Sequence, residues 1–144
     1  MKGVRFRKVQ LPYLELTEKM RMLALVLIAV IAALHFYIAW FEIFSWTTRG
    51  PKVFTVFPKE LFEQTTQMAA NQGIYNAFLA VGLVWALLIK DRKWQVNVAT
   101  CFLLFVAAAG LFGAITVTSK TFLIQTVPAL VAVSYTHLTL PTKA

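Results

Sequence analysis

The chain has 144 residues, of which 59% are hydrophobic and 14% are charged, and its formal net charge is +8. A soluble domain carries about 25% charged residues, so this composition excludes an ordinary soluble fold. The length fits one domain, and the long apolar stretches leave no room for a separate catalytic domain outside a membrane.

The basic residues cluster beside the apolar stretches. Six of them precede Met22, and three lie between Lys90 and Lys93. This is the positive-inside pattern of a membrane protein, and it argues against nucleic acid as the partner of the +8 charge. The pattern predicts a multi-pass protein of the bacterial inner membrane, with the lipid bilayer as its partner, both termini in the cytoplasm and residues 49–70 outside.

Residues 1–21 are expected to form a basic cytoplasmic lead with little structure of its own. The first span is expected over Met22–Phe44, because about twenty uncharged residues suffice to cross an ~30 Å hydrocarbon core. This stretch is longer than the apolar core of a cleavable signal peptide. Aromatic residues gather at its far end, as they do at a membrane interface, and Thr47–Pro51 are expected to break the helix.

The outer loop follows, and Pro58 is well placed to begin a short helix within it. The second span is expected over Gln72–Ile89 and the third over Val96–Val117. The charged turn Lys90–Lys93 between them is short, so these two spans should be antiparallel neighbours. Small side chains in the third span are expected to let helices of the same chain approach closely.

A fourth span is expected to begin near Thr121, with a kink at Pro128, and to end at Ala132. Residues Val133 to Thr142 resemble the translation of a transposon-end sequencing adapter. Residues 133–144 are therefore expected to be a non-native tail, and the natural C-terminus to be missing. The predicted fold is all-α, a four-helix transmembrane bundle over residues 22–132.

Polar residues interrupt the apolar stretches at one level of this bundle. His35 and Glu42 are seven residues apart, so they share one stripe of the first helix with an axial offset of ~10.5 Å. Ionisable residues within a membrane are costly, usually face the bundle interior and often mark a functional site. The candidate ligand-binding residues, expected to converge in the outer half, are His35, Glu42, Asn71, Gln72, Tyr75, Asn76 and Gln125.

The sequence contains no hydrolase elbow, phosphate loop, paired cysteine motif or His-Glu-x-x-His helix. No catalytic residue is therefore assigned, and no metal or cofactor is expected. The single cysteine, Cys101, lies in an apolar run and is expected to be a small buried hydrophobe.

Three runs resemble the family called domain of unknown function 1304, small bacterial integral membrane proteins with four predicted helices. They are His35-Phe-Tyr-Ile-Ala-Trp-Phe-Glu42, Asn71-Gln-Gly-Ile-Tyr-Asn76 and Gln125-Thr-Val-Pro128-Ala129. The resemblance covers roughly residues 22–132, and the second run is its most specific part. A Glu commonly precedes the His in that family, where this chain has Leu34. The resemblance implies the fold and the location, and it implies no reaction.

Three classes of function remain open. The first is a membrane-embedded module that binds or transports a small ligand or protons through Glu42 and His35. The second is an enzyme on a hydrophobic substrate, with one of these residues as general acid or base. The third is an accessory subunit whose polar residues only join helices. Four helices form a narrow pore unless the protein oligomerises, so a homo-oligomer is also left open.

Overall fold

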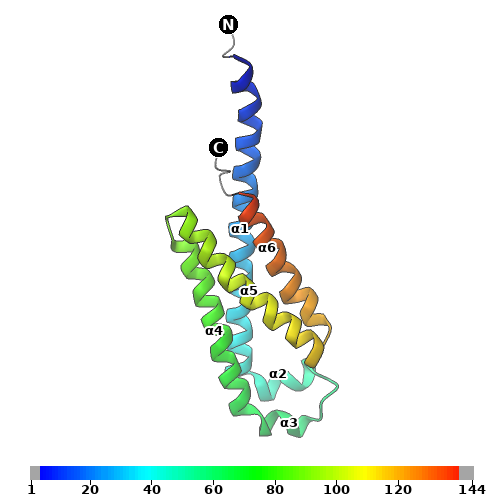
Figure 1. The fold of residues 1–144 in the computed structure, drawn as a ribbon. Coiled ribbons are helices and arrows are strands. Elements are labelled where there is room, and N and C mark those ends of the chain that lie inside the picture. Colours follow the sequence, from blue (N-terminus) through cyan, green and yellow to red (C-terminus); the bar gives the residue numbers. More distant parts are fainter. Residues whose placement is uncertain (1–3, 140–144) are drawn as a thin grey trace.

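The computed structural model describes residues 4–139, and every regular element in that range is a helix. An all-α fold is therefore confirmed for this part of the chain (Figure 1). The elements are α1 (Val4–Phe44), α2 (Trp46–Val53), α3 (Lys59–Gln64), α4 (Thr66–Leu88), α5 (Arg92–Thr116), the π-helix η1 (Phe122–Thr126) and α6 (Val127–Leu138).

Three helical segments are long and apolar enough to cross a membrane: Tyr13–Phe44, Thr66–Leu88 and Arg92–Thr116. A fourth apolar segment, Phe122–Leu138, is shorter. It combines the 5 residues of η1 with the 12 of α6, which gives a length of ~26 Å at 1.5 Å per residue. By length and composition, three spans are consistent with a membrane protein.

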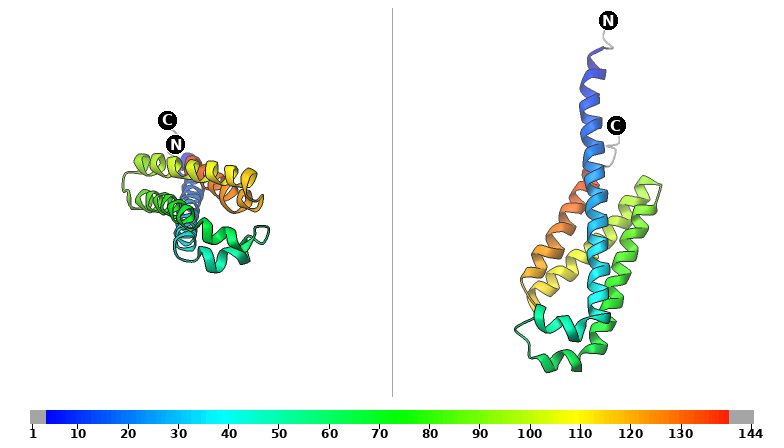
Figure 2. Two further views of the ribbon diagram at one scale, coloured as in Figure 1. Left: turned by 90° about the horizontal axis from the view of Figure 1, so that it is seen from below. Right: turned by 180° about the vertical axis from the view of Figure 1, so that it is seen from behind.

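The long helix α1 lies between α4 and α6, and its N-terminal part extends beyond the other helices (Figure 2). Helix α4 runs alongside α1, and α5 crosses over to contact both α4 and α6. The short helices α2 and α3 cover the end of the bundle where α1 ends (Figure 1). The short turn after α4 makes α4 and α5 antiparallel neighbours, as expected.

The described part of the lead, residues 4–21, is helical, so the expectation of little structure there was wrong. Helix α1 begins at Val4 and is 41 residues long. Residues 13–21 consist mainly of Leu, Glu, Lys, Met and Arg, which are good helix formers, so the spanning helix continues through them at little cost. Lys19 and Glu15 also form an ion pair of 2.7 Å, one helical turn apart.

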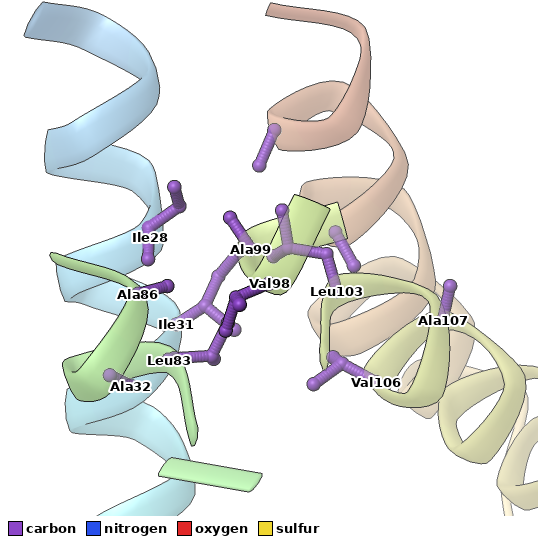
Figure 3. Close-up of a cluster of buried hydrophobic side chains, with 12 residues drawn as sticks. Ile28, Ile31, Ala32, Leu83, Ala86, Val98, Ala99, Leu103, Val106 and Ala107 are labelled. Carbon is purple, nitrogen blue, oxygen red and sulfur yellow. The ribbon is translucent and has the colours of Figure 1, made fainter. Parts of the chain in front are cut away.

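The core is a cluster of small and branched apolar side chains from α1, α4, α5 and α6 (Figure 3). Many of its members are alanines, which let the helix axes approach closely. The cluster comprises Ile28, Ile31, Ala32, Leu83, Ala86, Val98, Ala99, Leu103, Val106, Ala107, Ala129 and Ala132. Cys101 is not part of it: the thiol is exposed on the bundle surface, so the expected burial was wrong.

Two glycines permit backbone contacts that a side chain would prevent. A Cβ atom on Gly82 would overlap the ring of Phe102 on the next helix. A Cβ atom on Gly110 would lie 2.6 Å from Thr126 Oγ1, and that hydroxyl donates a hydrogen bond of 3.1 Å to the Ala107 carbonyl. Gly110 of the third span therefore packs within the chain, as expected, whereas Ala109 of the same span is exposed.

Several helix boundaries differ from the sequence expectations. Helix α4 begins at Thr66, six residues early, and α5 begins at Arg92, four residues early. Asp91 explains the second difference, because its side chain accepts a hydrogen bond of 2.8 Å from the Trp94 backbone N–H and so caps the helix.

The end of the first span also differs. Helix α1 ends at Phe44 as expected, but the chain bends at Ser45 and continues as α2. The expected break at Thr47–Pro51 was therefore wrong. Pro51 lies inside α2. Its missing N–H removes one bond, to a carbonyl in the first turn of this eight-residue helix, and the helix ends soon afterwards. Pro58 flanks α3, which begins one residue later than expected.

Pro128 changes the hydrogen bonding of the turn before it, and the expected kink stays a prediction. Proline has no N–H to donate to the carbonyl four residues before it. The preceding turn adopts π-helical bonding instead, in which the Val127 N–H donates to the Phe122 carbonyl. Helix α6 then continues to Leu138.

Candidate functional site

A hydrogen bond between a carboxylate and an amide joins α1 to α4 at the level predicted from the sequence. Asn76 Nδ2 donates to Glu42 Oε2 at 2.8 Å. Asn76 is 8% exposed, and Glu42 is half-buried. The two side chains therefore meet at the edge of the helix interface, with the amide inside and the carboxylate at its rim.

Gly73 explains why α4 comes close enough for this bond. It precedes Asn76 by about one helical turn, so the two residues lie on the same face of α4. A Cβ atom on Gly73 would lie 2.7 Å from Ile43 Cγ1 and 3.1 Å from the Ala39 carbonyl oxygen of α1. The absence of a side chain at this position lets the two backbones touch.

Among the residues that the structure describes, hydrogen bonds reach one of the two carboxylate oxygens of Glu42. Asn76 Nδ2 binds Oε2, and it also lies 3.4 Å from the Gln72 carbonyl oxygen. Within the described part of the chain, no donor is hydrogen-bonded to Oε1. A carboxylate accepts several hydrogen bonds, so Glu42 can accept another from a molecule at the rim.

His35 lies deeper in the bundle and is completely buried. Its Nδ1 is 2.9 Å from the Ile31 carbonyl oxygen. A carbonyl oxygen only accepts, so Nδ1 carries the hydrogen, and in the neutral ring Nε2 is then an acceptor. Nε2 is buried and has no partner among the described residues. The interior of the bundle therefore contains one unsatisfied lone pair.

The other candidate residues do not join this pair. Asn71, Gln72 and Tyr75 are exposed on α4, and Gln125 is partly buried on η1. Between residues 13 and 139, none of their side chains is hydrogen-bonded to Glu42 or Asn76. The reason lies in the helix geometry: Ala69, Gly73, Asn76 and Ala80 form the buried stripe of α4, and a residue one position away points about 100° elsewhere. As members of a ligand pocket, the seven residues remain a prediction.

An aromatic cluster next to Glu42 was not foreseen as a unit. Trp46 lies 6.1 Å from Phe41, 5.8 Å from Phe54 and 5.2 Å from Phe62, measured between ring centroids. Trp46 Nε1 also donates to Thr65 Oγ1 at 3.0 Å. These contacts hold α2 and α3 against the end of α1. The sequence signal was present as the aromatic residues around position 40, but it was interpreted only as an interface belt.

The structure contains a small cavity, and it lies elsewhere. The cavity has a volume of about 10 Å³, and residues of α1, α5 and α6 line it, including Arg21 and Arg92. None of the seven candidate residues contributes to its walls. No group of three or more His, Cys, Asp or Glu side chains that could bind a metal ion occurs in the searched residues, 4–139.

Long apolar helices around a partly buried carboxylate–amide pair define a small helical protein of the membrane type. The chain belongs to the family described as "Protein of unknown function (DUF1304)", whose profile matches residues 29–137. The resemblance found in the sequence is thereby confirmed. The match extends beyond Ala132 into the segment that resembles an adapter.

The chain is 29% identical over 108 residues to "Uncharacterized protein YpaA" of Lactococcus lactis subsp. lactis (strain IL1403). The alignment covers 74% of this chain and 89% of that protein. No solved structure matches the chain. The comparisons therefore identify a family and a bacterial relative, and neither of these is assigned an activity.

Proposed function

We propose that this is a four-span protein of the bacterial cytoplasmic membrane with its N-terminus in the cytoplasm. Phe122–Leu138 supports the fourth span, because a helix of ~26 Å falls only slightly short of the ~30 Å hydrocarbon core. The basic residues before α1 and between α4 and α5 support the orientation. In this arrangement Glu42 lies near the outer end of the bundle and His35 lies below it.

Within this bundle, Glu42 is a binding site for a proton or for a small ligand that donates hydrogen bonds. The observation that carries this proposal is the half-buried carboxylate with one oxygen held by Asn76 and the other unbonded. The Asn76 bond fixes the orientation of the carboxylate, so the open oxygen is presented in one place. The aromatic cluster around Trp46 limits the movement of the end of α1, which carries Glu42.

The arrangement favours binding from one side over conduction. Ile31 and Ile28 lie one and two turns from His35 toward the N-terminus, and both belong to the apolar cluster. Leu83 on α4 belongs to the same cluster and is completely buried. Apolar side chains do not carry ions, so this cluster supports binding from one side over conduction past His35.

The test is chemical modification of membrane-embedded carboxyl groups with dicyclohexylcarbodiimide, a membrane-soluble reagent that adds to protonated carboxyls. The purified protein is reacted in lipid vesicles and mapped by peptide mass spectrometry. We expect the adduct at Glu42 and expect methylammonium, a small donor cation, to slow its formation. Glu60 and Glu63 are exposed and serve as internal controls. A protein that reacts equally at all three glutamates, or not at Glu42, contradicts the proposal.

A second candidate function is that of an accessory subunit, in which the pair only joins helices. The Asn76 bond itself favours this, because interhelical hydrogen bonds are a common use of polar residues in membranes. Glu42→Gln separates the two, since a Gln oxygen still accepts from Asn76 while the charge is lost. A joining role predicts that Glu42→Gln keeps full function in the cell, and a binding role predicts that it abolishes function in a protein that remains folded.

A further inference from the structure

The small cavity lies at the end of the bundle opposite to Glu42. It is formed between α1, α5 and α6, and its volume of about 10 Å³ is enough for roughly one water molecule. Arg21 of α1 and Arg92 of α5 line it together. Its remaining walls on these helices are mainly apolar, and they include Ala24, Ile28 and Val96. The side chains of two arginines therefore line one small space whose other walls are mainly apolar.

The positive charge at this place is poorly compensated. The partner of Arg21 is Glu18, at a distance of 3.5 Å. Arg21 Nε is buried and without a hydrogen-bond partner in the described range. Arg92 Nη2 donates to the Thr139 carbonyl at 2.6 Å, and no carboxylate of residues 13–139 lies within 4.0 Å of Arg92.

The other polar groups nearby are already occupied. The Asp91 carboxylate accepts from the Trp94 backbone N–H as the cap of α5. Gln95 Nε2 donates to the Ala86 and Ile89 carbonyls, at 3.3 and 3.2 Å. Like charges close together repel each other, and a shared anion turns this repulsion into two favourable pairs. Guanidinium groups suit phosphate in particular, because their N–H groups form paired hydrogen bonds to its oxygens.

We propose that Arg21 and Arg92 bind the phosphate group of an anionic phospholipid. The cavity admits a phosphate oxygen but not a whole headgroup, so the rest of the lipid lies outside it. The arginines lie at the end of helices that are long and apolar enough to cross a membrane, so a lipid headgroup is the favoured source of the phosphate. Basic pockets between membrane helices are known to attract anionic lipid headgroups. The proposal requires that the chain be embedded in a membrane, and it is independent of the Glu42 site and of orientation.

The two proposed phosphate ligands, Arg21 and Arg92, come from α1 and α5. Thr136 of α6 and Thr139, the residue after this helix, also line the cavity. They fall in the segment that resembles a sequencing adapter, so no binding role is assigned to them. Arg21, Arg92 and the apolar walls of α1 and α5 do not depend on the origin of that segment.

The test measures lipid binding to the purified full chain in detergent by native mass spectrometry. Phosphatidylglycerol is the probe, phosphatidylcholine is the zwitterionic comparison, and inorganic phosphate is the competitor. We expect Arg21→Gln and Arg92→Gln each to weaken phosphatidylglycerol binding about fivefold or more, the loss typical of one basic contact at an anionic surface. The double variant should lose at least the product of the two.

Lys90→Gln and Lys93→Gln are the matched controls, because each substitution removes one positive charge, as the arginine variants do. Both lysines are exposed and lie in the same turn as Arg92. They should weaken binding by less than about twofold, because they do not line the cavity. If Arg92→Gln does not fold, Arg92→Lys keeps the charge and removes the paired hydrogen bonds, and it should still weaken binding measurably.

Three results would overturn the proposal. One is equal weakening by the lysine and arginine variants, which would indicate only general attraction to the charged end of the bundle. Another is equal affinity for phosphatidylcholine. The third is displacement of the lipid by millimolar inorganic phosphate, which would assign the arginine pair to a free anion.

Discussion

Adding one methyl group at Gly110 tests the packing of α5 against η1. A Cβ atom at this position would lie 2.6 Å from Thr126 Oγ1 and 2.9 Å from the Thr126 backbone nitrogen. The hydroxyl can rotate, but the backbone nitrogen cannot, so η1 must shift away from α5. The same shift weakens the hydrogen bond from Thr126 to the Ala107 carbonyl.

The expected magnitude for Gly110→Ala follows from three contributions. Overpacking costs about 1–3 kcal/mol. Loss of an interhelical hydrogen bond costs about 0.6–1.7 kcal/mol. Alanine gains about 1 kcal/mol over glycine in a helix, which offsets part of the loss. The free energy of unfolding should therefore fall by about 1–4 kcal/mol.

Gly113→Ala is the matched control, one turn further along the same helix. Its added Cβ would lie 3.1 Å from Thr121 Cγ2 and 3.7 Å or more from other atoms, and a side-chain methyl can move aside. We expect this variant to range from neutral to about 1 kcal/mol more stable than the wild type.

The assay is unfolding in mixed micelles with increasing dodecyl sulfate, followed by circular dichroism. The wild type and both variants are compared under identical conditions. If Gly110→Ala is as stable as Gly113→Ala, the close contact between α5 and η1 does not exist as described.

The remaining predictions concern the polar residues and the topology. Asn76→Ala should lower the free energy of unfolding by about 0.6–1.7 kcal/mol, because it removes the bond to Glu42. Asn97→Ala, at an exposed position, should change it little, and equal losses for the two variants in the same assay would contradict the Glu42 bond. His35→Leu should leave the free energy of unfolding unchanged or raise it by about 1–3 kcal/mol, because it removes a buried unpaired nitrogen. A clear decrease in that free energy would reveal a partner for Nε2. In a Cys101→Ser background, cysteines introduced by Lys59→Cys and Lys90→Cys should react with an impermeant maleimide from opposite sides of the membrane. Labelling of position 90 in intact cells would reverse the proposed orientation.

The sequence predicted the helical class and the level of the bundle at which Glu42 and Asn76 meet, because both depend on local patterns. Uncharged stretches of about twenty residues indicate spans, and the polar residues near their outer ends indicated the level of the contact. The exposure of Asn71 and Tyr75 could not be predicted in the same way. It depends on which stripe of α4 turns toward α1, and the contact at Gly73 decides that. The sequence around a glycine in an apolar run does not indicate which helix will pack against it.

The errors at helix ends have a common physical cause. Gly50 and Pro51 are typical of a break, yet α2 forms across them because Trp46 and its aromatic partners hold the segment against the bundle. The early start of α5 depends on one capping side chain, Asp91. Such tertiary contacts and caps override average preferences, so boundaries are harder to predict than the existence of an element.

The π-helix before Pro128 has a consequence for changes in chain length. A π turn holds one more residue than an α turn, because each N–H reaches back five residues instead of four. Deleting one residue within Phe122–Thr126 would restore α-helical spacing and leave Ala129 and Ala132 facing the core. The same deletion within α6 would rotate everything after it by about 100° and turn this face toward lipid. Residues 122–126 are therefore the place in the fourth apolar segment where the chain can shorten by one residue and keep its core.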